Sequence, residues 1–119
     1  MEFAANRKIL LEHLKSMAKV VPKASTRPEL TGFLIEANED DGYLYLTATN
    51  MEASIQRKLK PEVETGGSFV MNAKLLTDIL TALSGDEVRF KETKPGQVEI
   101  YAGRCTYTMS VLDDENYPR

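Results

Sequence analysis

The hydrophobic pattern of the first sixty residues predicts one strand, one helix and three further strands. Residues 2–5 are expected to be extended, and Asn6 is a good N-cap for a helix over about 7–20. That helix must end near Pro22, because the residue before a proline avoids the helical region. A polar loop follows, and then alternating apolar residues predict strands over 32–38, 43–49 and 52–59, the first two joined by a turn at Glu39–Gly42.

The second half of the chain shows the same order of elements after a connector at 61–67. A strand over 68–71 leads to Asn72, which is predicted to cap a helix over 73–83 that ends at Ser84-Gly85. Three strands close the chain, over 87–92, 97–102 and 104–112.

The two halves also align residue by residue. Residues 3–14 and 69–80 are identical at five of twelve positions, which are Phe3/Phe69, Asn6/Asn72, Lys8/Lys74, Leu10/Leu76 and Leu14/Leu80. Any two capped amphipathic helices after a strand resemble each other, so chance similarity is one explanation. An internal duplication, with units of about 1–60 and 67–112, is the other. It predicts two helices side by side on one face of an antiparallel sheet built from both halves.

Helical spacing separates an apolar from a basic face on the first helix. At 100° per residue, one stripe contains Leu10, Leu14, Met17 and Val21, while Lys8, Lys15 and Lys19 form nearly one line on the opposite side, interrupted by Glu12. Lysine faces are usually only solvated. Here the lysines form a line, and Lys23 and Arg27 extend it into the loop, so the line is a candidate series of phosphate contacts.

The second helix has a different charge pattern. It is expected to bury Leu75, Leu76, Ile79, Leu80 and Leu83 and to expose Lys74, Thr77, Asp78 and Thr81. Its outer face is therefore nearly neutral, and any contact with DNA should favour the first helix.

Charge and composition support one cytoplasmic domain. The 119 residues carry a net charge of −3, yet residues 1–30 hold six basic groups and three acidic ones. Such asymmetry is typical of a surface that faces a polyanion. The single cysteine excludes an internal disulfide, and residues 1–20 have no uninterrupted apolar run, so we expect neither a signal peptide nor a membrane span.

Candidate chemistry is sparse. His13 is the only histidine and is expected to be packed or half-exposed, and Cys105 is expected on one sheet face as a small apolar group. The acidic runs Asp113-Asp114-Glu115 and Asp40-Asp41-Gly42 are better explained as a solvated tail and a turn than as cation sites. No metal-ligand spacing, phosphate-binding glycine loop or nucleophile motif is present, so we expect no cofactor, no metal and no enzyme activity.

Six segments, in order and covering almost the whole chain, resemble one protein family. They are Met1-Glu2-Phe3 with Arg7-Lys8-Ile9-Leu10-Leu11, Arg27-Pro28-Glu29-Leu30, Leu46-Thr47-Ala48-Thr49-Asn50-Met51-Glu52, Asn72-Ala73-Lys74-Leu75-Leu76-Thr77-Asp78-Ile79, Gly103-Arg104-Cys105-Thr106-Tyr107-Thr108-Met109-Ser110 and Asn116-Tyr117-Pro118. Together they are similar to the N-terminal domain of the bacterial DNA polymerase III beta subunit, the sliding clamp.

The resemblance implies an α+β fold of the DNA-clamp type and a non-catalytic function in replication. A subunit of this family has three such domains, each internally duplicated, and two subunits close a head-to-tail homodimeric ring on duplex DNA. The ring binds DNA without sequence specificity and tethers DNA polymerase III. Polymerase and clamp loader bind through the later domains, so residues 1–119 would be the first of three.

The resemblance also implies roles for particular residues. Arg27 matches a loop arginine that approaches DNA, while Lys8, Lys15, Lys19 and Lys23 are assigned to DNA by their face rather than by a motif. Four residues match positions that meet the partner subunit: Lys74, Arg104, Tyr107 and Met109. Tyr107 and Met109 would supply apolar contacts there. Thr106 stands where some relatives carry a basic residue, so fewer ion pairs are expected.

Two alternatives remain open. The chain is about a third of a complete clamp subunit, so it is either a fragment or a natural single-domain relative. A protein-interaction module of the same fold, with purely solubilising lysines and no role on DNA, is the second functional hypothesis.

Overall fold

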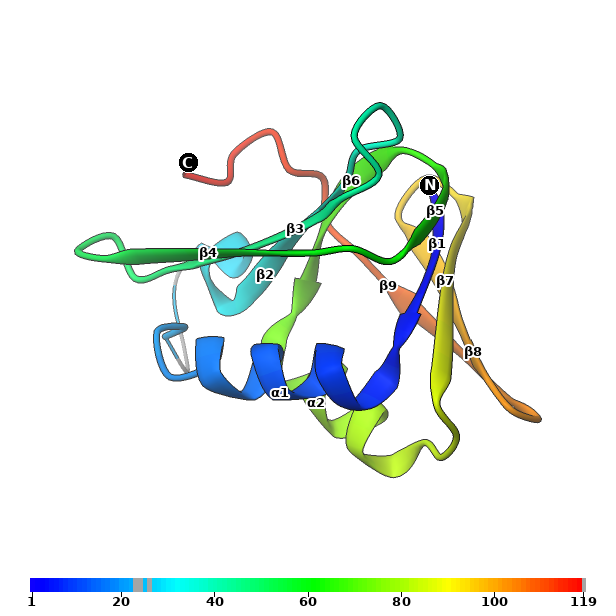
Figure 1. The fold of residues 1–119 in the computed structure, drawn as a ribbon. Coiled ribbons are helices and arrows are strands. Elements are labelled where there is room, and N and C mark those ends of the chain that lie inside the picture. Colours follow the sequence, from blue (N-terminus) through cyan, green and yellow to red (C-terminus); the bar gives the residue numbers. More distant parts are fainter. Residues whose placement is uncertain (23–24, 26, 119) are drawn as a thin grey trace.

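The computed structural model describes residues 1–22, 25 and 27–118. Within them the chain forms an α+β structure of two α-helices, nine strands and one short 3-10 helix (Figure 1). The elements of the first half are β1 (Glu2–Asn6), α1 (Arg7–Met17), η1 (Pro28–Thr31), β2 (Gly32–Ala37), β3 (Leu44–Thr49) and β4 (Ser54–Leu59). Those that follow are β5 (Glu62–Thr65), β6 (Gly67–Asn72), α2 (Ala73–Ala82), β7 (Glu87–Lys94), β8 (Gln97–Ala102) and β9 (Cys105–Ser110).

The strands form two antiparallel sheets, and each sheet combines both halves of the chain. The five-stranded sheet has the order β5-β1-β7-β8-β9, and the four-stranded sheet has the order β4-β3-β2-β6. β1 pairs with β7 of the second half, and β6 pairs with β2 of the first half. Each strand–helix–three-strand unit therefore donates its first strand to the sheet of the other unit. We expected one sheet built from both halves, but there are two. Each unit keeps its own three antiparallel strands in one sheet, and the first strand of the other unit is added to them.

Both helices begin at an asparagine in the same way. The Asn6 side-chain oxygen accepts the amide hydrogen of Ile9 at 3.0 Å, and the Asn72 oxygen accepts that of Leu75 at 2.9 Å. These bonds satisfy amide groups that have no partner inside the helix. The predicted caps are therefore confirmed in both halves.

The helices lie side by side and cover the same side of both sheets (Figure 1). Arg7, at the beginning of α1, donates to the carbonyl oxygens of Leu80 at 2.9 Å and Gly85 at 2.8 Å, so this end of α1 lies against the end of α2. The core lies between the helices and the sheets. There the rings of Phe3 and Phe90 stack, with their centroids 4.8 Å apart. The helices bury Leu10, Leu11, Leu14, Met17, Ala73, Leu76, Ile79 and Leu80.

Several details differ from the sequence predictions. The helix α1 ends at Met17 rather than near residue 20, because the chain turns after the cap at Ala18. β5 was expected to be part of a connector; it has a single apolar residue, and its pairing with β1 alone makes it a strand. Leu75 was expected to be buried but is 48% exposed, because it lies at the edge of the apolar stripe, beyond the reach of the sheets.

The segment after β9 returns across the outer face of the four-stranded sheet. Leu112 pairs with Val70 of β6, and the buried Tyr117 packs with Leu34 and Val70 on that face. The Tyr117 hydroxyl donates to the carbonyl oxygen of Thr47 at 3.1 Å. Burial of the phenol raises the pKa of Tyr117 to about 12. The tail therefore covers an apolar patch that the sheet leaves on its outer side.

Replacing the second cap tests the local account of α2. Asn72→Ala is expected to lower the free energy of unfolding by about 1 kcal/mol, whereas Asn72→Asp keeps an acceptor oxygen and should lose far less. Urea denaturation followed by circular dichroism measures both. Equal losses in the two variants would contradict the capping role.

Tyr117 makes the stability of the chain depend on alkaline pH. The unfolded chain releases this proton near the ordinary pKa of 10.0, and the folded chain does so near about 12. The contribution of the neutral phenol is complete below pH 10 and is lost as the pH rises towards 12, up to about 2 to 3 kcal/mol. Urea denaturation should show the wild type losing stability relative to Tyr117→Phe over this range. Parallel pH profiles for the two proteins would contradict the assignment.

Candidate nucleic-acid interface

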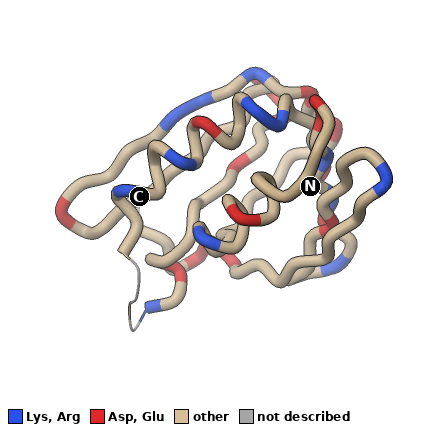
Figure 2. The backbone as a smooth tube through the Cα atoms, turned by 90° about the horizontal axis from the view of Figure 1, so that it is seen from below, with Lys and Arg blue, Asp and Glu red and all other residues tan. Residues whose placement is uncertain are grey.

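The solvent face of α1 carries the predicted lysine line. Lys8, Lys15 and the following Lys19 are all exposed, as is Glu12, which comes between them in the sequence. Figure 2, seen from the helix side, shows basic and acidic positions along α1. None of the three lysines takes part in an ion pair found between residues that the structure describes. Their charges are therefore available to an external anion. Ammonium groups about one and two helical turns apart can contact phosphates without reading a base sequence.

Arg57 adds a charge to this surface that the sequence prediction missed. It reaches from β4 to the flank of α1, where its Nη1 donates to His13 Nδ1 at 3.0 Å and its Nη2 to Ser16 Oγ at 3.1 Å. The sequence could have indicated this position, because Arg57 is two residues from both Ile55 and Leu59 and therefore shares the half-buried face of β4 with them. His13 is thus an acceptor for an arginine. The residues described here give it no partner suited to catalysis.

Arg27 is held by Glu29 and by the backbone of Asn116. Its Nε donates to Glu29 Oε1 at 2.9 Å, and its Nη2 donates to the carbonyl oxygen of Asn116 at 2.9 Å. The backbone amide of Glu29 and then the Arg27 guanidinium hold the pKa of the Glu29 carboxyl below its ordinary value. The ion pair partly neutralises Arg27. The expected contact at Lys23 lies outside the described residues.

The exposed face of α2 has no free cation comparable to the lysine line. Lys74, the counterpart of Lys8 in the second unit, forms an ion pair with Asp78 at 2.9 Å. Both side chains are exposed, so the pair adds little to stability, but it neutralises the charge of Lys74 locally. The positive charge on the helix side is therefore concentrated on α1, as the sequence pattern predicted.

Of the four residues assigned to a partner subunit, Lys74 lies on α2, whereas Arg104, Tyr107 and Met109 lie on or directly before β9, an edge strand of the five-stranded sheet. Arg104 and Tyr107 are exposed, and Tyr107 has 40% of its surface accessible. Met109 is only 3% exposed and belongs to the hydrophobic core. The apolar contact expected between Met109 and a partner subunit stays a prediction. Met109 is the one residue of β9 whose side chain is buried, and it packs into the core.

The other candidate features are structural. Cys105 is exposed on β9 rather than packed as a small apolar group, because the β8–β9 hairpin extends beyond the helices there. The turn at residues 39–42 is organised by Asn38, whose side-chain oxygen accepts the amide hydrogens of Asp40 and Asp41. Among the described residues no group of three His, Cys, Asp or Glu side chains is arranged to hold a metal ion. No helix in this part of the chain is both long and apolar enough to cross a bilayer.

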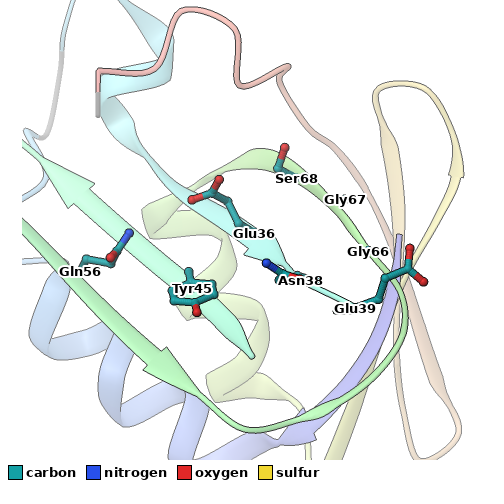
Figure 3. A pocket seen from close by; sticks show the side chains of 9 residues that line it. Glu36, Asn38, Glu39, Tyr45, Gln56, Gly66, Gly67 and Ser68 are labelled. Atoms are coloured by element: carbon teal, nitrogen blue, oxygen red, sulfur yellow. The ribbon is translucent and has the colours of Figure 1, made fainter. Parts of the chain in front are cut away.

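A depression of about 550 Å³ lies on the outer face of the four-stranded sheet (Figure 3). Glu36, Tyr45 and Ser68 line it together with the loop around Glu39. Tyr45 donates to Asp41 Oδ2 at 2.6 Å, and this bond raises the pKa of the phenol and lowers that of the carboxyl. Tyr45 is thereby a weaker acid than an ordinary tyrosine.

Comparison with protein families assigns the sequence to one family. The model of the DNA polymerase III beta subunit, N-terminal domain, matches residues 1–119. The chain therefore belongs to the beta subunit family of DNA polymerase III.

Relatives and solved structures agree. The beta sliding clamps of Staphylococcus epidermidis and Staphylococcus aureus are each 29% identical over 126 residues, covering 99% of this chain and 33% of the relative. Among solved structures, the beta subunit of Streptococcus pyogenes has a TM-score of 0.93 at 22% identity. The Pseudomonas aeruginosa sliding clamp has 0.91 at 27% identity, and each comparison covers 100% of this chain and 32% of the other. The chain spans about a third of the length of these relatives.

The positions of Tyr107 and Met109 predict opposite responses to truncation. Met109→Ala removes core volume and is expected to cost about 2 to 4 kcal/mol of unfolding free energy, whereas Tyr107→Ala should cost less than about 1 kcal/mol. Urea denaturation of the two variants tests this. A larger loss for Tyr107→Ala than for Met109→Ala would contradict the burial assigned to the two side chains.

Proposed function

We propose that residues 1–119 are the first of three domains of a sliding clamp subunit, and that this domain helps to encircle duplex DNA and to tether the replicative polymerase. The observation that carries the proposal is the row of unneutralised lysines on the helix side of the fold. Together with family membership, it fits a surface that follows a DNA backbone. The function is non-catalytic and belongs in the cytoplasm, where a bacterial chromosome lies.

The duplicated architecture supports an arc of a ring. Two units, about 1–60 and 67–112, hold two helices on one side, and the sheets form the opposite side (Figure 1). Lys8, Lys15 and Lys19 would then face the DNA, and Arg27 would add a contact from the loop before η1. Lys23, which lies outside the described residues, stays a predicted contact from the sequence alone. Since these contacts are made to phosphates and not to bases, the domain would allow sliding along DNA of any base sequence.

The open edge of β9 supports contact with a second subunit. A backbone edge can pair with a strand of another chain, and Tyr107 adds an exposed aromatic surface beside it. We propose a head-to-tail homodimer in which Arg104, Lys74 and Tyr107 meet the partner. Met109 would anchor β9 to the core behind this edge. Polymerase and clamp loader would bind domains beyond the segment described here.

Neutralising the lysine line in the full-length clamp tests the DNA-facing role. Lys15→Gln with Lys19→Gln is expected to weaken duplex binding several-fold and to lower the salt slope by about two, because each phosphate contact contributes about 0.9 to that slope. Fluorescence anisotropy at several salt concentrations measures both quantities.

The control changes net charge equally at another place. Lys91 and Lys94 are exposed on β7, and Lys91 lies on the sheet face opposite the buried Phe90. Lys91→Gln with Lys94→Gln should leave DNA binding nearly unchanged. Equal effects of the two double variants would favour an interaction module whose lysines only add solubility.

A further inference from the structure

Arg57 differs from Arg27 and Arg89 in the groups that hold its guanidinium. Arg27 is paired with Glu29, and Arg89 is paired with Glu2 at 3.1 Å and Glu64 at 2.8 Å. Arg57 is held by an imidazole and a hydroxyl, and it takes part in none of the ion pairs between described residues. Its charge is therefore fixed in place but not neutralised.

We propose that Arg57 is a direct DNA-phosphate contact, and that the DNA-facing surface runs from the lysine line of α1 across to β4. This inference rests on the proposed function and assigns a contact to a strand residue. It also ranks Arg57 above Arg27, because Arg27 must weaken its bond to Glu29 before it can bind a phosphate fully.

The position of Arg57 makes it continuous with the lysine line. Ser16 directly follows Lys15 and is rotated by about 100° around the helix, so the Arg57 guanidinium lies on the flank adjoining the lysines. The contacts with His13 and Ser16 place this part of β4 beside α1. Glu12 is an exposed acid on the same helix as Lys8 and Lys15.

The hydrogen bonds of Arg57 also prepare it for an anion. A guanidinium has five N–H donors, and the bonds to His13 and Ser16 use two of them. The remaining donors can bind phosphate oxygens in a planar arrangement. Because the side chain is already ordered, it loses less conformational freedom on binding than a free lysine does.

The only histidine of the chain reports on this contact directly. His13 Nδ1 accepts from Arg57, so a phosphate that engages the guanidinium must change the environment of the ring. Titration of the 119-residue chain with a short duplex DNA, followed by the imidazole NMR signals, is expected to shift them along a saturating curve. This measurement needs no substitution.

Variants then measure the contribution. Arg57→Gln is expected to raise the dissociation constant for the same duplex about three- to tenfold and to lower the salt slope by about one. Arg89→Gln removes the same charge where two carboxylates already neutralise it, and it should have little effect. Arg27→Gln should weaken binding less than Arg57→Gln does.

The outcomes separate this inference from the proposed function. If Lys15→Gln weakens binding while Arg57→Gln does not and the His13 signals stay in place, the contact at Arg57 is wrong and the DNA-facing role of α1 stands. If neither variant changes binding, or if millimolar duplex shifts no signal of α1, both are wrong. If Arg57→Gln weakens binding and the ring signals move, the contact is supported.

Discussion

The reciprocal donation of first strands holds this fold together. β1 completes the sheet of the second half and β6 completes that of the first, so neither half can satisfy its backbone hydrogen bonds alone. The stacked rings of Phe3 and Phe90 show the same dependence in the core, since they come from opposite halves. Because each helix directly follows a donated strand, both helices must emerge on one side of the molecule, and this position is the basis of every functional argument above.

A symmetric scaffold here carries an asymmetric surface. The caps at Asn6 and Asn72 are equivalent, yet the chemistry that follows them differs. Lys8 makes no ion pair within the described part of the chain, whereas its counterpart Lys74 is bound to Asp78. Duplication thus fixes the geometry of two helices, and a few side chains decide which helix has a net charge. The proposed contact with DNA depends on that second step.

Local signals allowed much of the fold to be predicted. Helix caps, turn residues and apolar periodicity act over a few positions, and they placed both helices and eight of the nine strands found among the described residues. Features that depend on tertiary pairing were missed. β5 is a strand because β1 pairs with it. The proposed role of Arg57 depends on its contacts with His13 and Ser16 of α1, which lie 44 and 41 residues away along the chain. Met109 is buried and Tyr107, on the same face of β9, is exposed; this difference depends on where along the strand the core ends, which the strand pattern does not show.

Encirclement of DNA is the central claim, and topology tests it more directly than affinity does. The proposed full-length clamp, with residues 1–119 as its first domain, should be loaded onto nicked circular duplex DNA, which is then cut once. A sliding ring remains on the closed circle and is lost rapidly through the ends of the linear form. Equal dissociation from circular and linear DNA would contradict encirclement.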